Sequence, residues 1–332
     1  MTPAPSRGTR APVHSDPVGI GGEVGGTRGA LLASAELDAL ERLGRVLRAR
    51  PGRAAGRAPG RTAGRGFDLL GLEPWREGGD VRHLDVAARV RTGSWWVRTF
   101  QQEGEPRLWI GLDASASMAG VKLAAARRVA AALVVVASQG LVRVAVETLG
   151  TPPAAAVPRA TRWRGPAQAA EALRRLASVR GDARFALPDA LGALALAASA
   201  AAADQLVVLS DLADPAGPAA ILEPLRALAA QARVDVVHLR EPADARLPPG
   251  ARALRSPETG EVRSIWLPEG RGALAAGDAF EAAVTAWQGA LGAAAARAGV
   301  ALHAANAVVL DAAPALPALA EVVRALLSPP WR

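Results

Sequence analysis

From about residue 106 onward, short apolar runs alternate with longer amphipathic segments. Four runs are apolar nearly throughout, as strands are when both faces of a sheet are covered: RLWIGLD, LVRVAVET, DQLVVLSD and RVDVVHL, at 107–113, 141–148, 204–211 and 233–239. Apolar residues at helical spacing predict helices at 121–139, 166–179, 187–203, 218–232, 277–298 and 316–327, with one more strand at 300–309. Strands separated by helices predict an α/β fold, a doubly wound and mostly parallel sheet.

Other patterns occupy the rest of the chain. Residues 1–33 have no apolar period and predict a disordered tail, whereas leucines recur on one face of a predicted helix at 34–50. Residues 241–270 contain several prolines and the turn sequence SPETGE, which indicates an excursion from the sheet. The expected division is therefore the tail, an N-terminal extension at 34–105, and the α/β domain at 106–332.

The positive charge is concentrated in one segment. The net charge is +8 and the pI is near 11.3, yet residues 42–66 hold eight arginines and no acidic residue. Lys122 is the only lysine in the chain, which indicates a coding bias toward arginine. The segment could bind nucleic acid in a salt-dependent manner, but it lacks interleaved aromatics and a recognition motif. A solvated loop is favoured, and nucleic-acid binding through 42–66 is an alternative function.

Several classes of chemistry are excluded or disfavoured. The absence of cysteine excludes disulfides, thiolate metal sites and cysteine nucleophiles, and the four histidines are scattered. A secretory signal and a long uncharged apolar run are both missing, which predicts a cytoplasmic protein without a membrane span. G-x-S-x-G, Walker and Ser-x-x-Lys motifs are also missing. We therefore expect no enzymatic activity; an unrecognised metal-dependent hydrolase is the alternative.

The strongest chemical signal is IGLDASASMAG at 110–120. Asp113 ends one predicted strand and Asp211 ends another, and ligands of doubly wound sheets bind in a crevice beyond such strand ends. Together with Ser115 and Ser117 they form an oxygen-only set that suits Mg²⁺ or Mn²⁺. The alternative is that these residues cap strand ends and the following helices, which Asp and Ser also favour.

Two motifs carry a family resemblance. Asp113, Ser115 and Ser117, followed by Met118, resemble the metal-ion-dependent adhesion site of von Willebrand factor A domains. Upstream, residues 64–103 resemble the signature of the domain of unknown function 58 family, with matching positions at Gly79, Asp80, Arg82, Leu84, Asp85, Ala88 and Arg89. The charged signature residues are expected to form a partly buried ion-pair network that fixes the extension against the A-type domain.

The resemblance implies a function and also shows a departure from the pattern. It implies a non-catalytic interaction module that takes a partner's acidic side chain through a bridging cation, and a MoxR-type AAA+ ATPase as the partner, in assembly or chaperone-like activity. The threonine of the metal site is replaced by Phe185 in RGDARFALPDAL, which offers no oxygen. Asp182 is a candidate replacement ligand, and Arg184 is a candidate to place a guanidinium in the cation's position.

Overall fold

The computed structural model describes eleven segments of the chain: 31–49, 63–75, 84–101, 107–139, 142–150, 161–163, 166–245, 250–255, 261–267, 271–312 and 315–327. Residues 1–30, most of the predicted tail, lie outside the described residues, as do residues 50–62 of the arginine-rich segment.

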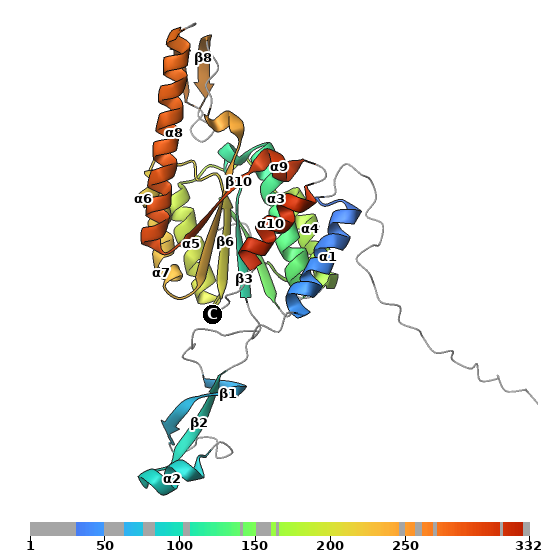
Figure 1. The fold of residues 1–332 in the computed structure, drawn as a ribbon, viewed down its shortest axis with the longest axis vertical. Helices are drawn as coiled ribbons and strands as arrows, with labels where there is room; N and C mark the ends of the chain where they lie inside the picture. Colours follow the sequence, from blue (N-terminus) through green and yellow to red (C-terminus); the bar gives the residue numbers. More distant parts are fainter. Residues whose placement is uncertain are drawn as a thin grey trace, which may run out of the picture.

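A six-stranded sheet organises the molecule, in the order β10-β7-β6-β3-β4-β5 (Figure 1). Five neighbouring strands are parallel and β5 pairs with β4 in the antiparallel direction. The bounds are β3 Arg107–Asp113, β4 Arg143–Leu149, β5 Thr161–Trp163, β6 Gln205–Ser210, β7 Arg233–Arg240 and β10 Ala301–Asn306. The predicted doubly wound α/β fold is confirmed. The edge strand β5 was not predicted, because three residues are too few to carry a period.

Helices cover both faces of this sheet (Figure 1). Leu108 and Ile110 of β3 lie in one buried cluster and Trp109 in the other, because successive side chains of a strand point to opposite faces. The first cluster includes residues of α1 (Ser34–Ala49), α3 (Val121–Ser138), α4 (Pro166–Ser178), α9 (Ala307–Asp311) and α10 (Leu316–Leu327). The second includes residues of α5 (Leu187–Ala200), α6 (Gly217–Leu222), α7 (Arg226–Ala229) and α8 (Arg271–Ala298).

Two predicted elements differ from the observed ones in kind, and others only in their bounds, such as the helix expected at 277–298, which begins at Arg271. The helix expected at 218–232 is divided into α6, a 3₁₀ turn at Glu223–Leu225 and α7, since Pro224 cannot donate a helical hydrogen bond. The strand expected at 300–309 ends at Asn306, whose side chain accepts hydrogen bonds from the backbone N–H groups of Val308 and Val309. That cap starts α9, so the prediction is wrong for 307–309.

Helix α1 packs on the α/β core, although the elements of residues 63–101 lie between α1 and the core in the sequence. Leu40 is fully buried in the first cluster. The Glu36 carboxylate accepts a hydrogen bond from Arg128 Nη2 at 2.6 Å and another from the Ala315 backbone N–H at 3.1 Å. A single buried acid therefore joins α1, α3 and the start of α10.

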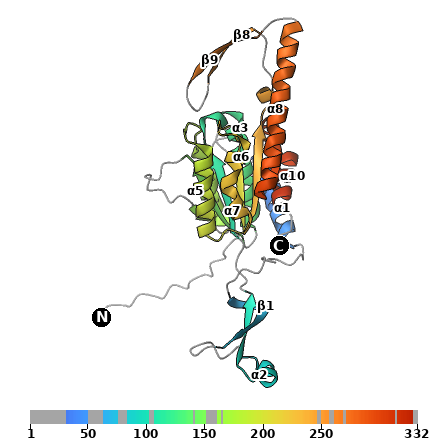
Figure 2. The same ribbon diagram turned by 90° about the vertical axis from the view of Figure 1, so that its left-hand side faces the viewer.

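Of the predicted N-terminal extension at 34–105, α1 thus belongs with the core, and the part at 63–101, called the extension from here on, forms a small unit of its own. β1 (Ala63–Pro74) pairs with β2 (Trp96–Gln101) in the antiparallel direction, and α2 (Val86–Thr92) precedes β2. Both views show this unit beyond the end of the sheet at which β3 begins (Figures 1 and 2). The extension is thus attached at the amino ends of the parallel strands.

The excursion leaves the sheet at the opposite end. After β7 come a 3₁₀ helix, η4 (Pro242–Ala245), and an antiparallel hairpin of β8 (Gly250–Arg255) and β9 (Val262–Leu267). The hairpin and the first turns of α8 extend beyond the carboxyl ends of the parallel strands (Figure 2). Across the described segments, every helix is too short or too polar to cross a membrane.

Candidate functional site

The two predicted aspartates lie side by side because their strands are neighbours. Asp113 is the last residue of β3, Asp211 directly follows β6, and β3 pairs with β6. From β3 the chain continues to β4 on one side, and from β6 it continues to β7 on the other. The connections therefore diverge here, which makes this strand pair the topological switch point where doubly wound sheets bind ligands.

Asp113 is almost fully buried beneath its own loop. Its side chain accepts hydrogen bonds from the Ser115 backbone N–H at 2.8 Å and from the Ser210 hydroxyl at 2.5 Å, and the residue is 1% exposed. Burial raises the pKa of this carboxyl group to about 6, the hydrogen bonds from Ser210 and Ser115 oppose the rise, and the Asp211 charge adds to it.

Asp211 connects the same loop to the first turn of α3, because it accepts hydrogen bonds from Ser117 and from Lys122. Its Oδ1 accepts hydrogen bonds from the Ser117 hydroxyl at 3.2 Å and the Ala213 backbone N–H at 3.1 Å. The Ser115 and Ser117 hydroxyl oxygens are 3.0 Å apart. All four predicted site residues are thus linked by hydrogen bonds, and together with Ser210 and Lys122 we call them the carboxyl-edge cluster.

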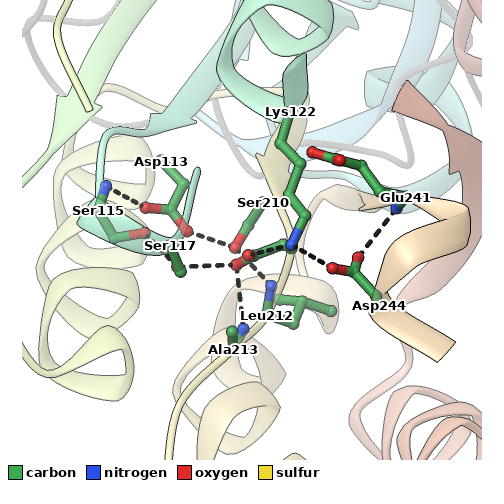
Figure 3. A network of polar contacts seen from close by, with 10 residues as sticks. Asp113, Ser115, Ser117, Lys122, Ser210, Leu212, Ala213, Glu241 and Asp244 are labelled. Carbon is green, nitrogen blue, oxygen red and sulfur yellow. Dashed lines mark hydrogen bonds and ion pairs between the residues drawn. The ribbon is translucent and has the colours of Figure 1, made fainter. Parts of the chain in front are cut away.

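The sequence reasoning missed two members of the cluster, Ser210, whose hydroxyl donates within the cluster, and Lys122. The Nζ of Lys122 lies 3.0 Å from Asp211 Oδ2 and 3.1 Å from Asp244 Oδ1 in η4 (Figure 3). Burial lowers the pKa of this amine, but the charges of Asp211 and Asp244 outweigh burial and raise it above its ordinary value. One signal could have indicated Lys122: it is the chain's only lysine and stands five residues after Ser117. Asp244, far along the sequence, carried no such signal.

The segment that carries Phe185 lies against the DASAS loop. Ala116 donates its backbone N–H to the Ala183 carbonyl at 3.0 Å, and Ala183 donates to the Ala114 carbonyl at 3.2 Å. The Phe185 ring packs on the second buried cluster and against Gly150, where a Cβ would come within 2.2 Å of the ring. Asp182 and Arg184 are exposed, and the cationic group seen in the cluster is the ammonium of Lys122.

The arrangement places a cation of the protein itself, the Lys122 ammonium, beside the candidate metal ligand Asp211. Every carboxylate oxygen of Asp113 and Asp211 already accepts a hydrogen bond from the protein. A cation bound to Asp211 would share it with the Lys122 ammonium and be repelled by it. Within the described residues, no group of three or more His, Cys, Asp or Glu could hold a metal ion. Binding of Mg²⁺ or Mn²⁺ by Asp113, Ser115, Ser117 and Asp211 stays a prediction.

The described signature residues stabilise the extension locally. Asp85 caps α2 by accepting a hydrogen bond from the Ala88 backbone N–H at 2.8 Å. Arg89 donates to the Gly93 carbonyl, and its guanidinium lies 5.1 Å from the centre of the Trp95 ring. Gly79, Asp80 and Arg82 lie outside the described residues, so the ion-pair network stays a prediction. In Figure 1 the extension and the carboxyl-edge cluster, which lies where β3 ends, are at opposite ends of the sheet.

Fold and site together define a doubly wound α/β protein with a polar cluster at its switch point. Within that class, the chain belongs to the family described as protein of unknown function DUF58, whose model matches residues 72–285. The match begins in β1 and includes the carboxyl-edge cluster, the excursion hairpin and half of α8. The predicted family is confirmed. No curated protein matches the chain at a significant level.

Proposed function

We propose that this protein is a non-catalytic interaction module of the cytoplasm, related to von Willebrand factor A domains, which binds an acidic side chain of a partner at the carboxyl-edge cluster. The supporting observation is that Asp113, Ser115, Ser117 and Asp211, which are distant in sequence, form one hydrogen-bonded group at the switch point. The D-x-S-x-S loop after the first parallel strand, with an acid after the neighbouring strand, corresponds to the docking site that the resemblance implies.

The partner in this proposal is a MoxR-type AAA+ ATPase, and the process is assembly or a chaperone-like activity. Genes of the family commonly lie beside those of such ATPases, which is the basis for this choice. A docking module at one end of a sheet, with a separate extension at the other end, suits a protein that links an ATPase to a further component.

The test is a pull-down of the ATPase from the neighbouring gene by the full chain. We compare wild type with Asp113→Asn and Ser117→Ala, which keep side-chain size and remove one charge or one hydroxyl. Asp113 is buried and supports the docking loop by accepting hydrogen bonds from Ser115 and Ser210. A hydrogen bond to a charged group contributes roughly 1.5–3 kcal/mol, so Asp113→Asn should loosen the loop and weaken capture by at least about tenfold.

Glu223→Gln is the matched control, because this exposed acid forms an ion pair with Arg226 on α7 rather than in the cluster. The control should capture the ATPase as wild type does. Equal capture by all four proteins would contradict the proposed docking site, and no capture by any of them would contradict the proposed partner.

A further inference from the structure

Lys122 occupies an unusual position for a basic residue. It is the second residue of α3, and the amino end of a helix carries a partial positive charge that disfavours cations. The carboxylates of Asp211 and Asp244, at 3.0 and 3.1 Å, offset that disadvantage. The ammonium is therefore held at this place by its two acidic neighbours.

The two carboxylates differ in how firmly they are held. The Asp211 side chain is 3% exposed and also accepts hydrogen bonds from Ser117 and Ala213. The Asp244 side chain is 43% exposed, and its other oxygen accepts a hydrogen bond from the nearby Glu241 backbone N–H at 2.9 Å. Asp211 is therefore held inside the cluster by several hydrogen bonds, whereas Asp244 contacts the ammonium from the solvent side.

Accessibility points to Lys122 as the group that a ligand would reach. Asp113, Ser115 and Asp211 are each 5% exposed or less, while the Lys122 side chain is 12% exposed beside the half-exposed Asp244. Ser117 is also partly exposed, but its hydroxyl is neutral, so Lys122 is the charged group that a ligand reaches. An incoming acidic side chain would meet the ammonium rather than the buried carboxylates, and it would meet it at the place that Asp244 now occupies.

We propose that Lys122 is the resident cation of the carboxyl-edge cluster and that Asp244 of η4 is an intramolecular occupant, which an acidic side chain of the partner replaces. Identification of the cluster as a docking site rests on the proposed function; the occupancy by Asp244 does not. Docking is then an exchange of carboxylates on one ammonium and needs no metal ion.

The charges around Lys122 explain why the partner's carboxylate replaces Asp244 instead of binding beside it. Asp211 and Asp244 already flank a single ammonium, and the charges of Asp113 and Asp211 already interact unfavourably, so a further carboxylate added beside them would be repelled. Replacement of Asp244 leaves the number of charges unchanged. The Asp244 side of the ion pair faces solvent, with 43% of the side chain exposed, and solvent screening keeps the free energy of such a pair small. A partner that brings additional contacts can therefore displace Asp244.

The test uses the reactivity of Lys122 toward an amine-acetylating reagent. Because Lys122 is the only lysine, mass spectrometry of the peptide that contains it reports on the site alone. In the full chain, Asp244→Ala should accelerate acetylation of Lys122 about two- to fivefold, the range that corresponds to losing one exposed ion pair. Glu223→Ala, which breaks the exposed pair with Arg226, should leave the rate unchanged.

A second arm measures the exchange itself. A short peptide with a single glutamate should slow acetylation of Lys122 in Asp244→Ala and have a smaller effect in wild type, where Asp244 competes with it. The same peptide with glutamine should have no effect. Adding Mg²⁺ or EDTA should change none of these rates.

Three outcomes would overturn the proposal: an unchanged rate in Asp244→Ala, equal protection by the two peptides, or peptide protection that requires Mg²⁺. None of these measurements uses the ATPase. Failure of the pull-down with normal exchange on Lys122 would therefore contradict the proposed partner, whereas normal capture without exchange would contradict the role of Asp244.

Discussion

At the scale of single residues, the kind of cation in the site decides what the site can do. A lysine ammonium is a compact point charge on a flexible stem, unlike the planar guanidinium that dominates this chain. It fits between Asp211 and Asp244, which lie on two different segments. The residues that resemble a metal site therefore surround a charge that belongs to the protein.

This arrangement predicts the metal affinity of the protein. In calorimetry with Mg²⁺ and Mn²⁺, wild type and Asp113→Ala should give equal, negligible heats, because the ammonium repels a second cation at Asp211. Lys122→Met removes that charge, and it should gain weak Mn²⁺ binding that is lost again when Asp113→Ala is added. Heat in wild type that disappears in Asp113→Ala would show that a divalent cation binds despite Lys122.

At the scale of elements, a buried polar network attaches α10 to the sheet. Asp235 of β7 is fully buried and accepts hydrogen bonds from Gln205, Arg233 and His303, at 2.6, 3.0 and 2.8 Å. Gln205 also donates to the Leu326 carbonyl and Arg233 to the Ala325 carbonyl, at 2.9 and 3.0 Å. The last turn of α10 is thus held to β6 and β7 by Gln205 and Arg233, both of which the Asp235 carboxylate orients.

The network predicts how stability depends on pH. Burial raises the pKa of Asp235, but the hydrogen bonds from His303, Arg233 and Gln205 outweigh burial and lower it below 3.8. The carboxylate therefore stabilises the fold above pH 3.8, and this contribution is lost as the pH falls below that value. Urea unfolding of wild type should show this loss, and Asp235→Asn should show a smaller one.

The same variant should be strongly destabilised at neutral pH. Removing one partner of a buried ion pair reduces the free energy of unfolding by roughly 3–5 kcal/mol. Glu223→Gln serves as the control, since its exposed pair with Arg226 contributes little. If Asp235→Asn were as stable as wild type at neutral pH, the proposed attachment of α10 would be wrong.

At the scale of the whole molecule, the features divide between the two ends of the sheet. The carboxyl ends of the strands carry the carboxyl-edge cluster, η4 and the excursion hairpin, and the amino ends carry the extension with β1, β2 and α2 (Figures 1 and 2). An interaction at one end leaves the other available. The net charge of +8 belongs largely to the arginine-rich segment 42–66, which is a separate feature.

The nucleic-acid alternative is tested at this scale. Residues 42–49 belong to α1, which packs on the core, and 63–66 belong to β1, so the deletion should be confined to 50–62. We expect DNA binding that is weak, lost between about 50 and 200 mM salt, and reduced by the deletion, with ATPase capture unchanged. Sequence-specific binding that persists at high salt would favour the alternative instead.

Much of the fold could be predicted from the sequence because apolar periodicity is a local property. The buried runs at 107–113, 204–211 and 233–239 indicated strands, and their alternation with helices indicated the parallel sheet. The same patterns failed where a single side chain decides the outcome, as at Asn306, which ends β10 and starts α9, or where an element is as short as β5.

The sequence by itself determined the fold class, the family and the four residues that gather at Asp113 and Asp211, because strand-end residues of neighbouring parallel strands meet at one edge. Only the tertiary structure decided what surrounds them. Lys122 lies 89 positions from Asp211 and pairs with it, and Asp244 joins them from η4. Contacts between segments so far apart depend on how helices and loops pack on the sheet, which no local pattern of residues records.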